Sequence, residues 1–145
     1  MSRRALILDA NILIRAVLGN RVRALILENA PAVKFFAPDV AYADAYHYLP
    51  ALLTKRGLPA DTVLETLEAL ETLVHSIDAN LYGGLKNRAL QRIAARDADD
   101  WPVLACALML DCPIWTEDSD FFGTGVATWT SDRITLYFSE IEGIG

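Results

Sequence analysis

The sequence contains few of the residues on which several classes of protein depend. Its 145 residues include two cysteines, Cys106 and Cys112, whose spacing matches neither a CxxC motif nor a zinc site, so we expect reduced core thiols. Its two histidines, His47 and His75, lie far apart, and nothing indicates a Ser-His-Asp or Cys-His nucleophile. No apolar run reaches the roughly 18 residues of a membrane span, so no membrane partner is expected.

Basic residues are also scarce. Thirteen Lys and Arg against nineteen Asp and Glu give a net charge of −6, which argues against binding nucleic acid by charge alone. The charges are unevenly placed, however: the first 34 residues hold six basic residues and two acids, whereas seven acids lie between Asp97 and Asp120. An acidic pocket beside basic flanks is typical of a metal-using nuclease, because the metal bridges carboxylates and phosphate. The alternative is an ordinary acidic cytosolic protein with solvated charges.

Length and composition favour one domain, spanning residues 1–145, with a sizeable core. The apolar fraction of 53% suggests buried parallel strands or a face covered by a partner. The N-terminus starts like a signal peptide, but Asp9 cuts its apolar stretch short. We therefore expect no signal and a cytoplasmic location.

Apolar runs and helical patterns alternate along the chain. Strands are expected at residues 4–8, 33–37, 73–77, 113–116 and 126–130, and helices at 11–18, 21–29, 40–55, 61–72, 82–95 and 101–110. Residues 135–138 are expected to form a last strand or part of the tail. Pro50 should kink or divide its helix, and Asp61 should cap the next one. This order predicts an α/β fold with a parallel sheet covered on both faces, whose ligand site lies beyond the carboxyl ends of the strands.

Aspartates stand where the expected strands end. Asp9 follows the first strand, Asp118 and Asp120 follow the fourth, and Asp97 and Asp100 precede the helix at 101–110. Carboxylates gathered in one pocket repel one another unless they are protonated or hold a cation. An all-oxygen cluster suits Mg²⁺ or Mn²⁺. The pattern therefore predicts a metal site for phosphodiester chemistry.

Helix capping is the alternative interpretation of two of these acids. Asp9 could cap the helix at 11–18, although acids at equivalent places favour the metal role. Asp100 could cap the next helix together with the first-turn Pro102, but Asp99 could do the same and leave Asp100 facing the pocket.

Segment 116–120 (TEDSD) is too dense in acids for simple capping. Alternation along an extended chain would send Glu117 away from Asp118 and Asp120. Asp118 is the preferred site acid, and Asp120 comes second.

Arg88, Arg92 and Arg96 share one face of the expected helix at 82–95, because they are spaced i, i+4 and i+8. The stripe leads to Asp97 and could follow the phosphate backbone of RNA into the pocket. A solvated helix face is the more common explanation of such a stripe.

Three segments, 8–11 (LDAN), 96–105 (RDADDWPVLA) and 115–123 (WTEDSDFFG), occur in an order and spacing that resemble the PIN-domain family. Its members include the VapC-type toxins of bacterial and archaeal toxin–antitoxin pairs, and the resemblance runs from about Ala5 to Thr130. It implies a three-layer α/β/α sandwich with a central parallel sheet and an endoribonuclease that uses one or two Mg²⁺ or Mn²⁺ ions. A metal-activated water would attack phosphorus in line. A toxin would also imply a homodimer and a neutralising antitoxin.

The resemblance also implies roles for individual residues. The site acids would be Asp9, Asp100 and Asp118, with Asp97 or Asp120 assisting and Asn11 and Thr116 as polar second contacts. The family usually carries a further site acid, a Glu early in the helix after the second strand. Here Asp44, which is one methylene shorter, would take that place as a catalytic and metal-binding acid.

Other classes fit less well. A phospho-receiver module needs a cation near its last strand, yet Arg133 is the only basic residue after Asp118. An Asp-nucleophile phosphatase usually has a second Asp where this chain has Asn11. A PIN-like binding module for metal or RNA without nuclease activity, favoured by Asp44, and a stand-alone RNA-processing nuclease remain as alternatives.

Overall fold

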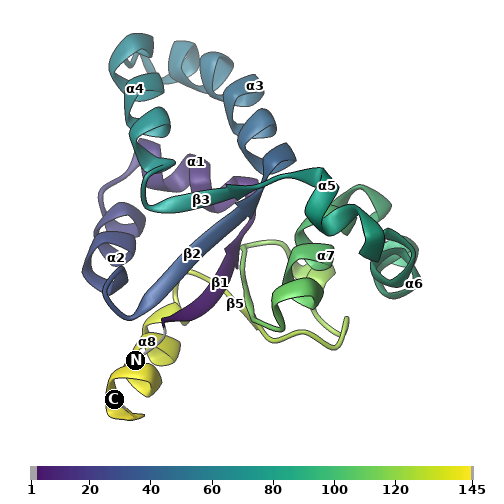
Figure 1. Cartoon of the computed structure of the whole chain (residues 1–145). Coiled ribbons are helices and arrows are strands. Elements are labelled where there is room, and N and C mark those ends of the chain that lie inside the picture. Colours follow the sequence, from purple (N-terminus) through teal and green to yellow (C-terminus); the bar gives the residue numbers. More distant parts are fainter. Residues whose placement is uncertain (1–2, 145) are drawn as a thin grey trace.

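A five-stranded sheet lies at the centre of the protein (Figure 1). The computed structural model describes residues 3–144, so residues 1, 2 and 145 of the expected domain lie outside the described part. All neighbouring strands are parallel, in the order β3-β2-β1-β4-β5, which confirms the expected parallel sheet. The strands are β1 (Arg4–Leu8), β2 (Val33–Pro38), β3 (Val74–Ile77), β4 (Ile114–Trp115) and β5 (Thr128–Trp129).

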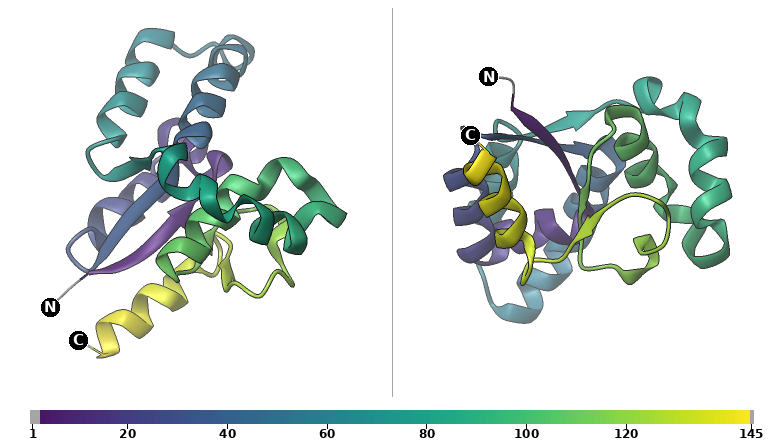
Figure 2. Two further views of the ribbon diagram at one scale, coloured as in Figure 1. Left: turned by 45° about the vertical axis from the view of Figure 1, so that its right-hand side comes forward. Right: turned by 90° about the horizontal axis from the view of Figure 1, so that it is seen from below.

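Helices cover both faces of this sheet, as a three-layer α/β/α sandwich requires (Figures 1 and 2). Side chains on β1 alternate between the two cores, with Leu6 and Leu8 in one and Ile7 in the other. The first core is covered by α1 (Ala10–Leu18), α2 (Arg21–Asn29), α3 (Asp39–Arg56), α4 (Ala60–Leu70) and α8 (Ile134–Ile144). The second is covered by α5 (Ala79–Tyr82), α6 (Lys86–Asp97) and α7 (Trp101–Leu110).

Two expected elements differ from the structure. Residues 135–138 belong to α8 rather than to a strand or tail, because Ile134, Tyr137 and Phe138 share one helix face and pack into the first core. The expected helix at 82–95 begins only at Lys86, after α5 and the 3₁₀ turn η1 (Gly83–Leu85). The glycine pair at 83–84 weakens the helix at that point.

Division of the helix, one of the two effects expected of Pro50, does not occur, and the cap expected at Asp61 was wrong. Pro50 does not divide α3, which continues to Arg56 with Leu49 and Leu53 buried on either side of the proline. Asp61 lies in the first turn of α4, and the cap position is Pro59. A carboxylate in the first turn still interacts favourably with the helix dipole.

None of the described helices is long and apolar enough to cross a membrane. Both cysteines are free, and Cys106 is buried.

The strand order creates a crevice at one edge of the sheet. The chain leaves β1 towards β2 on one side, whereas β4 pairs with β1 on the other side. Ligands of open α/β sheets bind at such a switch point, beyond the carboxyl ends of the strands. Asp9 directly follows β1 and Thr116 directly follows β4, so both lie at this crevice.

Candidate metal centre

Asp9 is the most buried acid of the site, with 9% of its surface exposed. Its Oδ1 accepts the Ala10 N–H at 2.7 Å. Its Oδ2 accepts the Thr116 hydroxyl at 2.8 Å and the Asn11 side-chain amide at 3.0 Å. Asp9 is therefore both the N-cap of α1 and an acid held in one orientation at the end of β1.

Thr116 and Asn11 join the ends of the two central strands. The Thr116 hydroxyl donates to Asp9 and accepts from the Asp118 N–H at 3.0 Å and from Asn11 Nδ2 at 3.3 Å. Asn11 Oδ1 accepts the Glu117 N–H at 3.2 Å. A hydroxyl has one donor and two acceptor positions, so every polar position of Thr116 is used. Both residues bond to Asp9, and their role as second contacts of a metal site stays a prediction.

Asp97, Asp100 and Asp120 form the closest acidic group among the described residues. One carboxylate oxygen of each lies within 4.8 Å of the other two. They come from the end of α6, from the 3₁₀ turn η2 (Ala98–Asp100) and from the 3₁₀ turn η3 (Ser119–Phe121). The structure thus brings Asp100 together with two residues that were expected only to assist.

Asp100 is not a side-chain cap of α7. It occupies the cap position, but its carboxylate bonds no backbone N–H of the helix, and Asp99 does not take over that function. The Oδ2 atom of Asp100 is buried and has no hydrogen-bond partner among the described residues. The capping interpretation of Asp99 and Asp100 was therefore wrong, although Pro102 does lie in the first turn as expected.

The electrostatics of the cluster favour a cation. Burial raises the pKa of Asp100 to about 8, helped by a hydrogen bond that its protonated form can make to Asp118 and by the charges of Asp9, Asp118 and Asp97. Burial also raises the pKa of Asp9, and the bonds from Thr116 and Ala10 oppose this shift. An orphaned buried carboxylate oxygen among further carboxylates fits a hard divalent ion with oxygen ligands.

The other predicted acids take different places. Asp118 accepts the Asp120 N–H at 2.9 Å, and its charge raises the pKa of both Asp9 and Asp100. Asp44 is exposed on α3 and does not belong to the closest group, although its charge also raises the pKa of Asp9. Glu117 turns away and accepts the Ser131 N–H at 2.7 Å.

Two of the three predicted arginines hold the loop that carries Asp118 and Asp120. Arg92 Nη1 donates to the Thr124 carbonyl at 3.0 Å, and Arg96 Nη1 donates to the Ser119 carbonyl at 3.2 Å. Gly125 has a φ of +88°, and a Cβ atom there would lie 2.8 Å from Arg92 Nη1. These two contacts were not predicted from the sequence, in which the paired glycines of segment 123–125 (GTG) were the available signal.

Asp39, at the start of α3, was also missed. Its carboxylate accepts the N–H groups of Val40 at 2.8 Å and Ala79 at 3.1 Å, together with the Tyr82 hydroxyl. The Tyr82 ring packs on Trp101, with 5.6 Å between the ring centroids, directly beside Asp100. Asp39 therefore joins helices from opposite faces of the sheet near the site. An acid directly after a strand was the signal in the sequence.

Comparison with known proteins agrees with this geometry. The family model described as PIN domain matches residues 7–139, so the chain belongs to the PIN-domain family. PIN domains are in general nucleases, which are hydrolases. Comparison with curated proteins gives no match.

Several solved structures share the fold. VapBC2 from Rickettsia felis bound to a DNA fragment from their promoter is 14% identical, over 87% of this chain and 98% of that chain, with a TM-score of 0.61. FitAcB from Neisseria gonorrhoeae is 20% identical, over 88% and 99%, with a TM-score of 0.58. FitAB bound to an IR36 DNA fragment is 19% identical, over 87% and 94%, with a TM-score of 0.57.

Proposed function

We propose that this protein is an endoribonuclease dependent on Mg²⁺ or Mn²⁺ and that it acts as the toxin of a toxin–antitoxin pair. The observation that carries the proposal is the Oδ2 of Asp100, which is buried and has no hydrogen-bond partner in the described part of the chain. It lies among further aspartates at the switch point of a PIN-domain sheet. Burying a carboxylate oxygen without a partner costs free energy of folding unless a cation or a proton binds to it.

The aspartates would hold one or two ions. Asp9, Asp100 and Asp118 are the proposed main ligands, with Asp97, Asp120 and Asp44 contributing. A bound Mg²⁺ or Mn²⁺ supplies Lewis acidity, which offsets phosphodiester charge and favours attack by water at neutral pH.

The supporting residues would keep this acidic site in shape. Thr116 and Asn11 would hold the Asp9 carboxylate in a single orientation. Hydrolysis forms a bond between phosphorus and the water oxygen and breaks the bond to the leaving oxygen, which takes up a proton. No covalent intermediate with the protein is needed. The stripe of Arg88, Arg92 and Arg96 lies on the helix that leads to Asp97 and would offer positive charge to the RNA strand.

The toxin role is supported by likeness to VapBC2 and FitAB, together with the resemblance to VapC-type toxins. A toxin of this type would form a homodimer, and an antitoxin would cover the acidic crevice. Both expectations can be measured directly. Light scattering after size-exclusion chromatography gives the oligomeric state, and co-expression with the product of a neighbouring small gene shows whether growth inhibition is relieved.

The nuclease itself is tested with purified protein and a mixed pool of structured and single-stranded RNA. The reaction arms contain Mg²⁺, Mn²⁺ or EDTA. The variants are Asp9→Asn and Asp118→Asn, and Asp99→Asn serves as a control because Asp99 is exposed and makes no side-chain hydrogen bond among the described residues. We expect discrete cuts that need metal, persist in the control variant and vanish in the other two.

The opposite results are equally informative. Cleavage at the wild-type rate by Asp9→Asn or Asp118→Asn would remove those residues from the proposed site. Metal binding by a folded protein that cuts no RNA would support a binding module instead. Cleavage without any growth inhibition in cells would support a stand-alone RNA-processing nuclease.

A further inference from the structure

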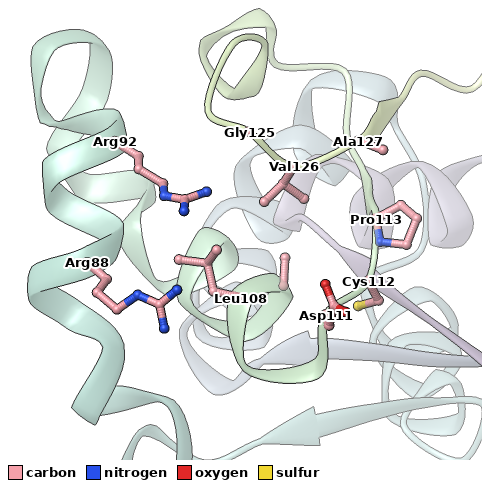
Figure 3. Close-up of a pocket in the computed structure, with 10 residues that line it drawn as sticks. Arg88, Arg92, Leu108, Asp111, Cys112, Pro113, Gly125, Val126 and Ala127 are labelled. Atoms are coloured by element: carbon pink, nitrogen blue, oxygen red, sulfur yellow. The ribbon is translucent and has the colours of Figure 1, made fainter.

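A second polar pocket lies on the side of the molecule where β4 begins, between α6, the end of α7 and the loop before β5 (Figure 3). It has a volume of about 410 Å³, which is within the range of small-ligand sites. Cys112 and Pro113 line it, and both precede β4, whereas the aspartate cluster lies beyond the end of that strand. The pocket is therefore separate from the candidate metal centre.

The pocket carries opposite charges on facing walls. Arg88 and Arg92 project into it from α6, and the carboxylate of Asp111 faces them from the other side (Figure 3). Arg92 donates one N–H to the Thr124 carbonyl oxygen. Among the described residues, Arg88 makes neither a hydrogen bond nor an ion pair, so its whole donor set is available. Such a pocket suits a ligand with an anion at one end and a hydrogen-bond donor at the other.

A guanidinium group is well suited to phosphate, because its planar set of donors can bind two phosphate oxygens at once. A carboxylate accepts hydrogen bonds from hydroxyl or amino groups. A nucleotide offers both chemistries, and the pocket is large enough for one.

The position of the pocket relates it to the candidate metal centre. Arg88 lies nine residues before Asp97 on α6, which corresponds to roughly 13 Å along the helix axis. The loop from Asp118 to Ala127 connects the acidic cluster with the opposite wall of the pocket. A strand that crosses the acidic crevice and continues over this loop would reach the pocket beyond the scissile phosphate.

We propose that this pocket binds one nucleotide of the RNA strand at a distance from the cleavage position, with Arg88 on the phosphate and Asp111 on a donor of the same nucleotide. This inference rests on the proposed function. It names a second contact for the substrate that the aspartate cluster does not provide.

The test measures binding and cleavage separately. Binding of a labelled single-stranded RNA octanucleotide is measured by fluorescence anisotropy in EDTA, at several salt concentrations. The variants are Arg88→Gln and Asp111→Asn, with Arg133→Gln as the matched control, because Arg133 is exposed and does not line the pocket. Asn is suitable at position 111, whose φ is +50°, because Asn tolerates left-handed backbone. Thermal melting confirms that each variant is folded.

We expect Arg88→Gln to weaken octanucleotide binding roughly tenfold, as for one lost charge-assisted contact. The slope of log K against log salt should become shallower by roughly 0.7, the value for one phosphate contact on a single strand. Asp111→Asn should also weaken binding, and Arg133→Gln should not. With Mg²⁺, Arg88→Gln should raise the KM for the octanucleotide roughly tenfold, in line with its loss of binding, whereas Arg133→Gln should not.

Wild-type RNA affinity in a folded Arg88→Gln variant would overturn the proposal that the pocket binds RNA. Equal weakening of RNA binding by Arg133→Gln would also overturn it. The two proposals fail in different ways. If the wild type cleaves RNA and Arg88→Gln binds RNA as tightly as the wild type, only the proposed role of the pocket is rejected. If RNA binding depends on Arg88 but the wild type cleaves no RNA, the RNA-binding role of the pocket is supported and the proposed nuclease activity is rejected.

Discussion

Arg96 on α6 donates a hydrogen bond from Nη1 to the carbonyl oxygen of Ser119, 3.2 Å away, directly before Asp120. The bond links the helix that ends in Asp97 to the turn that carries Asp120. These two aspartates belong to the closest acidic group of the site. Among the described residues, Arg96 makes no hydrogen bond to any carboxylate of this group, yet it links the two elements that carry Asp97 and Asp120. Arg96 is therefore a positioning residue.

Replacing Arg96 by Met should weaken metal binding while keeping the aliphatic stem of the side chain. Loss of comparable supporting contacts typically reduces metal affinity or activity roughly 10–100-fold. Isothermal titration with Mn²⁺ measures the change, and Arg133→Met removes the same charge at an exposed position. Equal Mn²⁺ affinity in the Arg96 variant and the wild type would show that the loop keeps its position without the hydrogen bond from Arg96 to Ser119.

Gly125 should be the more sensitive of two glycines with positive φ. Ala at Gly125 would have a φ of +88° and a Cβ atom 2.8 Å from Arg92 Nη1, whereas Gly57, with a φ of +65°, has open space around it. Left-handed backbone costs an Ala residue about 1 kcal/mol in either place. We expect Gly125→Ala to lower the free energy of unfolding, measured in urea, clearly more than Gly57→Ala. Equal losses would mean that the Arg92 side chain moves aside freely.

RNA cleavage should depend on the hydroxyl group of Thr116 rather than on the shape of its side chain. Thr116→Val keeps the volume but leaves Asp9 Oδ2 and the Asp118 N–H without that partner. We expect cleavage to fall roughly 10–100-fold and to recover largely in Thr116→Ser, which restores the hydroxyl. Initial rates at saturating Mg²⁺ give the comparison. Full activity in the Val variant would show that Asn11 alone orients Asp9.

The metal-free protein should lose stability as the pH rises. The pKa of Asp100 is raised from 3.8 to about 8 in the folded state, so the folded protein holds this proton more tightly than the unfolded chain does. The resulting stabilisation is fully present below the unfolded value and is lost as the pH rises through about 8. Melting temperatures in EDTA between pH 5 and 9 should show the decline, and Asp100→Asn should reduce it.

Asp99→Asn is the control for this pH experiment, since Asp99 is the exposed neighbour of Asp100. It should keep the wild-type decline. As a proposed metal ligand, Asp100 would exchange its proton for Mg²⁺, so the stabilising effect of Mg²⁺ should grow with pH. An unchanged pH profile in Asp100→Asn would place the origin of the decline in another group.

The amino-acid sequence by itself determined which segments become strands and where most of the candidate site residues lie along them. Short apolar runs bounded by Pro, Gly and Asp are local signals, so β1, β2 and β3 occur where they were expected. In a parallel sheet every strand ends at the same edge, which is why Asp9 and Asp118 were expected at one crevice. The hydrogen bond from Thr116 to Asp9 was not predicted from the topology. The PIN-domain motifs contain these same residues.

Only the tertiary structure decided which acids approach one another most closely. Asp97 and Asp120 lie 23 positions apart and meet because Arg96 holds the loop against α6, a contact that no local pattern encodes. The same holds for residues 135–138, where a short apolar run is compatible with a strand or a helix. Packing of Ile134, Tyr137 and Phe138 into the first core selects the helix. Local periodicity thus sets the elements, while long-range packing sets α8 and the geometry of the acidic site.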